Sequence, residues 1–305
     1  MKKTTGLIPT LILLTIALTA CTSTPEATAP TTETLITPIA ASATPGPSST
    51  PTEVVNYYAS VNGFGIRQSS FDASLLQFKT ALQTYPDLLP DGQTAEEVVL
   101  ESLVQRALLA MAAQEAGFTA DQQIIEAHVA ELVAQAGGED AFRAWLAANG
   151  YTAETFLYEL PLEIEAAWQR DQIAASVPTT MEQIRAQQIF FVDGYLASRA
   201  YNQLEAGIAF ETIQENNSPN DPGYIDWFPR GYLVFPELED TIFSLQPGQY
   251  SPVIETPAGY HIVYILERDP NHELSPEVRL YLQQQAVEQW LAQQMAQSQV
   301  EIYAP

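Results

Sequence analysis

The feature that most constrains the fold is a change of hydrophobic periodicity near residue 183. From about residue 70 to residue 176, apolar residues recur at the three- and four-residue spacing of helices. From Gln183 the segment IRAQQIFFV alternates apolar and polar residues, and YHIVYILE at 260–267 is a strongly apolar strand. Because the two patterns occupy separate stretches, the sequence predicts an α+β chain with a helical half followed by a strand-rich half.

Turn and capping residues divide the helical half. Asn62-Gly63 lies between two short apolar runs and predicts a hairpin over 57–68. Thr119 with Gln122 predicts a capping box, and Gly117 ends the helix before it. The expected helices cover residues 70–85, 94–116, 119–136, 139–148 and 153–176.

The strand-rich half is predicted to contain two strands, 184–192 and 260–267, and short helices at 195–206 and 236–243. Residues 216–236 are rich in Asn, Pro, Gly and aromatic residues and predict an irregular loop. Ser275-Pro276-Glu277 starts a last helix with a capping serine and a proline at its first position. The apolar face of that helix is expected to pack on the helical half.

The N-terminus predicts export. Lys2 and Lys3 precede an apolar run from Leu7 to Leu18 that is too short to span a bilayer comfortably. Leu18-Thr19-Ala20-Cys21 resembles a bacterial lipobox, which implies a signal peptide over residues 1–20 and lipidation of Cys21. The alternative is a plain secretory signal that is cleaved after Ala20 and leaves an unmodified cysteine.

Residues 21–53 are Thr, Pro, Ser and Ala with few large apolar side chains. Such a stretch buries too little surface to offset its ordering entropy, so we expect a disordered tether. Signal, cysteine and tether together predict a lipid-anchored protein on the extracytoplasmic side of the cell membrane. Thr22 follows the cysteine, so the sequence does not show which membrane of a two-membrane envelope holds the anchor.

Charge and residue content exclude several function classes. The chain has 37 Asp and Glu against 12 Lys and Arg, a net charge of −25, which repels nucleic acid and disfavours a basic membrane patch. The single cysteine excludes an intramolecular disulfide. His128 stands alone in its predicted helix, and the chain has no metal-ligand spacing, phosphate loop or serine elbow. We expect neither a metal nor a cofactor.

The stretch 184–268 resembles the parvulin family of peptidyl-prolyl isomerases, through WFPRG, FSLQPGQYSPV and TPAGYHIV in that order. The opening ASVNGFGIRQSSFD and the helices up to residue 180 resemble the chaperone domain of PrsA- and SurA-type foldases. The resemblance implies a four-stranded antiparallel sheet surrounded by helices. It divides the chain into an all-helical chaperone-like domain at 54–181, a parvulin domain at 182–270 and a C-terminal helix within 271–305.

The resemblance also assigns site residues. Ile225, Leu238 and either Leu233 or Val234 match the lining of the proline pocket, with Phe243 behind it. His261 and Thr256 match the family's histidine and threonine.

Two family groups are replaced. Gln188 stands where a partner histidine is expected, and Asn220, with Asp221 beside it, stands where a Cys or Asp is usual. Gln188 can still hydrogen-bond His261 as an amide, and a purely structural Gln–His pair is the alternative.

These residues predict a parvulin-type isomerase and foldase that binds X-Pro segments of unfolded, exported polypeptides. The alternative is a chaperone or holdase whose parvulin module is catalytically weak or inactive. A solute-binding lipoprotein also begins with a lipobox and a tether, but it would show repeated βαβ signals over two lobes. The single strand-rich module argues against it.

Overall fold

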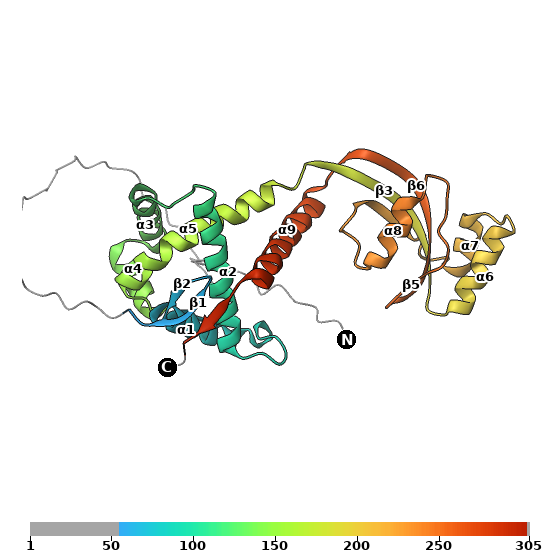
Figure 1. The fold of residues 1–305 in the computed structure, drawn as a ribbon. Helices are drawn as coiled ribbons and strands as arrows, with labels where there is room; N and C mark the ends of the chain where they lie inside the picture. The colour runs from blue at the N-terminus through green and yellow to red at the C-terminus, as the bar shows by residue number, and fades with distance from the viewer. Residues whose placement is uncertain (1–54, 304–305) are drawn as a thin grey trace, which may run out of the picture. The chain divides into compact units, whose positions relative to one another are not determined.

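The structure is a computed structural model that describes residues 55–303 (Figure 1). Cys21, the signal peptide and the tether lie outside the described residues. The chain forms two compact units. Of the described residues, unit 1 comprises 55–167 and 295–303, and unit 2 comprises Trp168–Gln294. The predicted division into domains at residues 181 and 182 stays a prediction.

Unit 1 contains a small sheet as well as helices. Strands β1 (Tyr57–Val61) and β2 (Phe64–Arg67) form the predicted hairpin, and its turn residues Asn62 and Gly63 have φ angles of 50° and 84°. These left-handed angles match a type I′ turn, which asparagine and glycine tolerate best. Strand β7 (Val300–Ile302) pairs antiparallel with β1. The expectation of an all-helical first domain is therefore corrected, because a three-stranded sheet of order β2-β1-β7 belongs to unit 1.

The α-helices of this half lie where the apolar periodicity predicted them, as α1 (Gln68–Thr84), α2 (Ala95–Glu115), α3 (Gln122–Ala136), α4 (Glu139–Ala148) and α5 (Ala153–Ala175). A short 3-10 helix that the sequence did not predict, η1 (Pro86–Leu88), follows α1, and α5 continues beyond Ala167 into unit 2. One cap differs from the prediction. Asp121, and not Thr119, caps α3 by accepting from the Ile124 N–H at 2.9 Å. Asp121 directly precedes the helix, so its carboxylate reaches the third free N–H.

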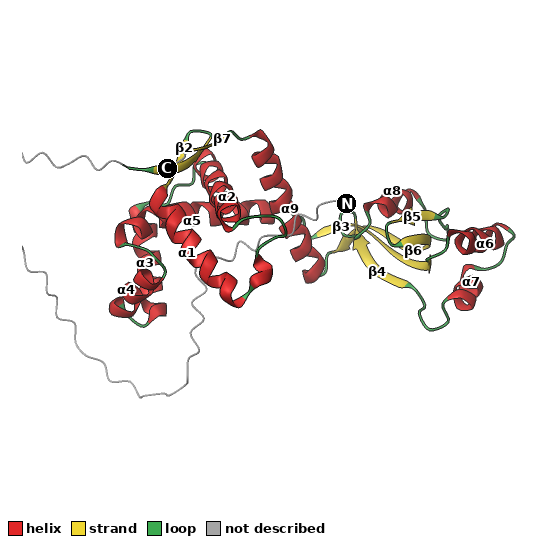
Figure 2. Cartoon of the chain, turned by 90° about the horizontal axis from the view of Figure 1, so that it is seen from below, coloured by secondary structure: helices red, strands yellow, loops and turns green. Residues whose placement is uncertain are grey.

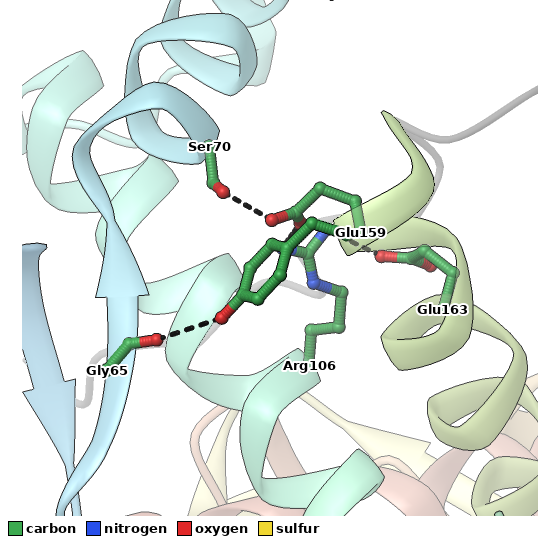
Figure 3. Close-up of polar contacts among 6 residues, drawn as sticks. Gly65, Ser70, Arg106, Glu159 and Glu163 are labelled. Carbon is green, nitrogen blue, oxygen red and sulfur yellow. Dashed lines mark hydrogen bonds and ion pairs between the residues drawn. The ribbon is translucent and has the colours of Figure 1, made fainter. Parts of the chain in front are cut away.

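A buried ionic cluster joins three helices of unit 1 (Figure 3). Arg106 of α2 bonds Glu163 of α5 at 2.8 Å and also pairs with the buried carboxylate of Glu159. The Ser70 hydroxyl of α1 donates to Glu159 as well. Burying a carboxylate is costly unless it is paired and hydrogen-bonded, so these partners make the burial of Glu159 tolerable.

Unit 2 is built on a four-stranded antiparallel sheet of order β4-β3-β6-β5 (Figure 2). Its strands are β3 (Thr180–Phe191), β4 (Tyr224–Pro229), β5 (Ile254–Thr256) and β6 (Gly259–Glu273). This is the sheet that the parvulin resemblance implied. The predicted irregular loop over 216–236 is corrected, since β4 lies within it. Strand β4 is an edge strand, where a terminal proline such as Pro229 is tolerated.

Helices cover both faces of this sheet. Helices α6 (Gly194–Glu205) and α7 (Phe210–Asn217) pack on the face that carries Ile189 and Ile262. Helix α8 (Pro236–Ser244) packs on the opposite face, with Ile184, Val263 and Ile265. His261 also lies on that second face, with Val263 and Ile265, because alternate residues of β6 point to the same side.

The last helix, α9 (Pro276–Gln297), begins as predicted, with the Ser275 hydroxyl accepting from the Val278 N–H at 3.2 Å. Within unit 2, Val278 is buried beside Val177 and Leu274. From Met295 onward the chain groups with unit 1, where Met295 packs against the core. The helix is therefore shared between the units.

Candidate active site

His261 is the centre of a short hydrogen-bonded chain on the α8 side of the sheet. Its Nδ1 lies 3.1 Å from Gln188 Oε1, and its Nε2 lies 2.9 Å from Thr256 Oγ1. Gln188 comes from β3, whereas Thr256 ends β5, so β6 carries the histidine between its two neighbouring strands. The structure thus brings together three of the four polar residues that the resemblance assigned.

Burial sets the charge state of this histidine. Only 5% of His261 is exposed, and removal from water lowers the pKa of its imidazole below the ordinary value of 6.5. The ring is therefore neutral near pH 7. In that state Nδ1–H donates to the Gln188 carbonyl, and Nε2 accepts from the Thr256 hydroxyl. Both ring nitrogens therefore have a hydrogen-bond partner, and neither partner is charged.

The turn beside the histidine requires a glycine. Gly259 has a φ of 150°, and a Cβ at this position would lie 2.5 Å from the Phe191 carbonyl oxygen and 2.8 Å from the Phe190 ring. The absent side chain lets the ring of Phe190 approach His261, with ring centroids 5.0 Å apart. This ring is 40% exposed and forms one wall of the site.

The apolar residues assigned to the proline pocket mostly gather on the same face. Leu238 and Phe243 are buried in one cluster, and Ile225, Leu233 and Phe235 pack against it. Phe235 also links this cluster to the histidine, with ring centroids 6.1 Å apart. Val234 is 84% exposed and stays outside the cluster, so the structure brings Leu233 rather than Val234 to this position.

Asn220 lies apart from the hydrogen-bonded chain. It is exposed in the loop between α7 and β4, and none of the hydrogen bonds found among residues 55–303 joins it to His261. The neighbouring Asp221 carboxylate accepts from the Gly223 N–H at 2.9 Å, so it stabilises the loop itself.

One stabilising residue was missed by reasoning from the sequence. The Glu239 carboxylate of α8 accepts from the Gly231 N–H at 2.8 Å and the Leu233 N–H at 3.2 Å. It therefore holds the segment that carries Leu233. The available signal was an acidic residue in the first turn of a helix that follows a glycine-containing loop, which is a common pattern for capping.

The site has no metal-binding arrangement within the part of the chain that the structure describes. No group of three His, Cys, Asp or Glu side chains there is close enough to hold an ion.

None of the helices between residues 55 and 303 combines the length and the apolarity that a membrane crossing needs.

Fold and site together define a parvulin domain that follows a chaperone-like region. Residues 194–267 match the family model of the PPIC-type PPIASE domain, and residues 34–165 match that of the SurA-like N-terminal domain. The chain therefore contains a parvulin-type isomerase domain and a SurA-like N-terminal domain.

The relatives include foldases. The chain is 26% identical over 223 residues to the foldase protein PrsA of Caldanaerobacter subterraneus, covering 67% of this chain and 71% of the relative. It is 29% identical over 109 residues to the foldase protein PrsA of a Geobacillus strain, covering 33% of this chain and only 39% of that relative. A solved structure of the PrsA peptidylprolyl isomerase from Bacillus cereus aligns at 20% identity with a TM-score of 0.46, covering 79% of this chain and 89% of that one.

Proposed function

We propose that this protein is a parvulin-type peptidyl-prolyl isomerase and foldase that acts on exported polypeptides. The observation that carries the proposal is the neutral His261, held between Gln188 and Thr256 at the edge of an apolar cluster. The apolar cluster is the proposed slot for the proline ring, and the polar groups at its edge suit the amide that precedes the ring.

The reaction needs no nucleophile. Rotation about an X-Pro bond faces a barrier of roughly 18–20 kcal/mol because amide resonance must be broken. An enzyme lowers this barrier by binding the twisted amide more tightly than either planar isomer. Ile225, Leu233 and Leu238 would hold the proline ring by burial, which fixes one side of the bond.

The hydrogen-bonded chain would act on the other side of the bond. Gln188 and Thr256 hold the imidazole in one orientation, so the site does not have to reorganise as the amide twists. Phe190 and Phe235 flank the imidazole and exclude water from it. Water exclusion strengthens the interaction of these polar groups with the rotating amide.

The proposed clients are unfolded or partly folded polypeptides, as the foldase relatives suggest. The SurA-like region would hold them while the parvulin domain acts on their X-Pro segments. The lipobox-like LTAC and the Thr/Pro/Ser tether support action outside the cytoplasmic membrane from a lipid anchor at Cys21.

A second candidate function is a chaperone whose parvulin domain binds X-Pro segments without isomerising them. Gln188 and Asn220 favour it, because each replaces a group that the family normally supplies. Both functions require the apolar slot, and only the first requires His261 to speed rotation.

The test is a proline-isomerisation assay on a short X-Pro peptide, with wild type, His261→Ala and Leu238→Ala. Isomerase function predicts a rate above the uncatalysed one that falls in both variants. The binding-only function predicts the uncatalysed rate for all three proteins, with peptide affinity lost in Leu238→Ala alone. Circular dichroism of each variant confirms that it remains folded.

A further inference from the structure

The loop over residues 218–223, Ser-Pro-Asn-Asp-Pro-Gly, joins α7 to β4 and carries Asn220. Pro219 and Pro222 have no N–H group, so the loop supplies few backbone donors of its own. Its carbonyl groups need partners wherever they are shielded from water. The partners come from two glutamine side chains on other elements.

Gln214 of α7 provides the first attachment. Its Nε2 donates to the Ser218 carbonyl at 3.1 Å and also to the Asp221 carbonyl. Gln187 of β3 provides the second, with its Nε2 donating to the Pro222 carbonyl at 2.7 Å. Each glutamine is only 4% exposed. Burying two side-chain amides is unfavourable unless they make such bonds, so their position is tied to the loop.

The same loop is bonded to the strand that carries the candidate site. The Gln188 N–H donates to the Gly223 carbonyl at 2.8 Å, while the Gln188 side chain bonds His261. Gly223 has a φ of 67°, and a Cβ there would lie 2.1 Å from the Gln188 carbonyl oxygen. The backbone of the loop therefore lies directly against the residue that orients the imidazole.

Neighbouring glutamines of β3 thus have separate tasks on opposite faces. Gln188 points to the His261 side, and Gln187 points to the side that α6 and α7 cover, because successive residues of a strand alternate. A shift of the loop would move Gln188 through the Gly223 contact. It would also move Ile225, which follows the loop and packs on the apolar cluster.

We infer that Gln187 and Gln214 are positioning residues of the isomerase site. They hold the 218–223 loop so that Gln188 keeps its bond to His261 and Ile225 keeps its place beside the proline slot. The inference rests on the proposed function for its effect on catalysis, whereas the attachment of the loop can be measured without any activity.

The test replaces each glutamine by methionine, which has a similar length and no donor, in the full-length protein. Gln246→Met on an exposed turn is the matched control. NMR hydrogen exchange then follows the amides of Asp221, Gly223 and Gln188. We expect about tenfold faster exchange at these amides in both variants, with no change at Ile189, which pairs with Ile262.

Kinetics separate positioning from a structural role. We expect kcat for an X-Pro peptide to fall about tenfold in Gln187→Met and Gln214→Met, at a temperature where circular dichroism shows folded protein. KM should rise as well, because the loop also places Ile225 beside the apolar cluster. A merely structural role would lower thermal stability and leave kcat unchanged.

Several results would overturn the inference. Unchanged exchange of the loop amides would show that the glutamines do not hold the loop, and faster exchange with unchanged kcat would show that the loop does not position the site. If the wild type only matches the uncatalysed rate, the proposed function fails. The inference is then judged by X-Pro peptide affinity, which must weaken in both variants. Should a methionine variant fail to fold, Gln→Asn, which withdraws the amide by one methylene, takes its place.

Discussion

At the scale of single residues, the proposed isomerase function depends on the pair Gln188 and His261. The imidazole is neutral and bonded on both nitrogens, and its partner on β3 is an amide that cannot gain or lose a proton. The electrostatic support for a rotating amide is therefore limited to fixed dipoles.

Restoring a histidine at position 188 should raise the isomerase rate. We expect Gln188→His to increase kcat/KM for an X-Pro peptide by about tenfold, which is less than the ~10²–10³ typical of a donor in acyl transfer because this reaction develops less charge. Gln246→His adds the same group on an exposed turn and should change nothing. A Gln188→His protein that is folded and no faster than wild type would argue for the binding-only chaperone.

The buried histidine also predicts a pH dependence of stability. Because burial lowers the pKa of His261, the unfolded chain binds more protons than the folded chain near and below the ordinary pKa of about 6.5. The free energy of unfolding should therefore fall as the pH drops through that value, and it should level off above it. Urea denaturation between pH 5.5 and 8 measures this dependence. His261→Gln should remove that part of the slope.

Residue chemistry predicted some of this site and not the rest. The bond between Gln188 and His261 follows from a family match and from amide chemistry. The task of Gln187 does not follow, because Gln187 and Gln188 look alike in the sequence until the pairing of β3 decides which face each one takes. The task of Gln214 does not follow either, because its bonds to the loop exist only in the folded chain. The choice between Leu233 and Val234 likewise depends on where the backbone turns before α8.

At the scale of elements, helix α8 and the loop before it supply apolar residues to the proposed proline slot. Leu238 is 5% exposed on this helix, whereas Val234 is 84% exposed four residues earlier. Leu238→Ala should lower the free energy of unfolding by about 2–5 kcal/mol and weaken X-Pro peptide binding, because it leaves a cavity in the cluster. Val234→Ala should stay within about 0.5 kcal/mol of wild type with unchanged binding. Denaturation and peptide titration of both variants check this. Equal effects of the two substitutions would show that α8 does not contribute to the proposed slot.

Elements with a strong local signal were predicted well. The Asn62-Gly63 hairpin and the helix that starts at Ser275 depend on turn and capping residues only a few positions apart. Strand β4 was missed because it is short, lies at an edge and ends in a proline, so its own residues resemble a loop. Its strand conformation comes from pairing with β3, which the local pattern does not contain.

At the scale of the whole molecule, the two ends of the described chain meet in one sheet. Strand β7 pairs with β1 across almost the full length of the chain, with Val300 opposite Val61. No local pattern predicts such a pairing, since three residues carry little periodicity of their own. The C-terminal residues are therefore part of unit 1, and a protein that lacks them loses an edge of its sheet.

The division into units predicts a division of labour. The parvulin fragment Thr180–Glu273 keeps all four strands of its sheet, so it should fold and retain isomerase activity on a short peptide. It lacks the SurA-like region and should not suppress the aggregation of an unfolded client. Light scattering of a chemically denatured client, with the full-length protein as the comparison, measures this. Equal suppression by the fragment would place client holding in the parvulin domain itself.

The remaining prediction concerns where the molecule acts. Cys21 is the only cysteine in the chain and ends the sequence LTAC after a short apolar run, so acylation there would supply more than one buried lipid chain. One chain gives only marginal membrane binding, and two or more give a stable anchor. Cys21→Ser should therefore move the protein from the membrane pellet to the soluble extracytoplasmic fraction, with its isomerase rate unchanged because the substitution lies far from the site in sequence. Thr22→Ser, one residue further on, is the matched control and should leave the protein in the pellet. Fractionation with immunoblotting measures the location of both variants. If the Cys21→Ser protein still pellets in the absence of any partner, the plain secretory signal is the better account of the N-terminus.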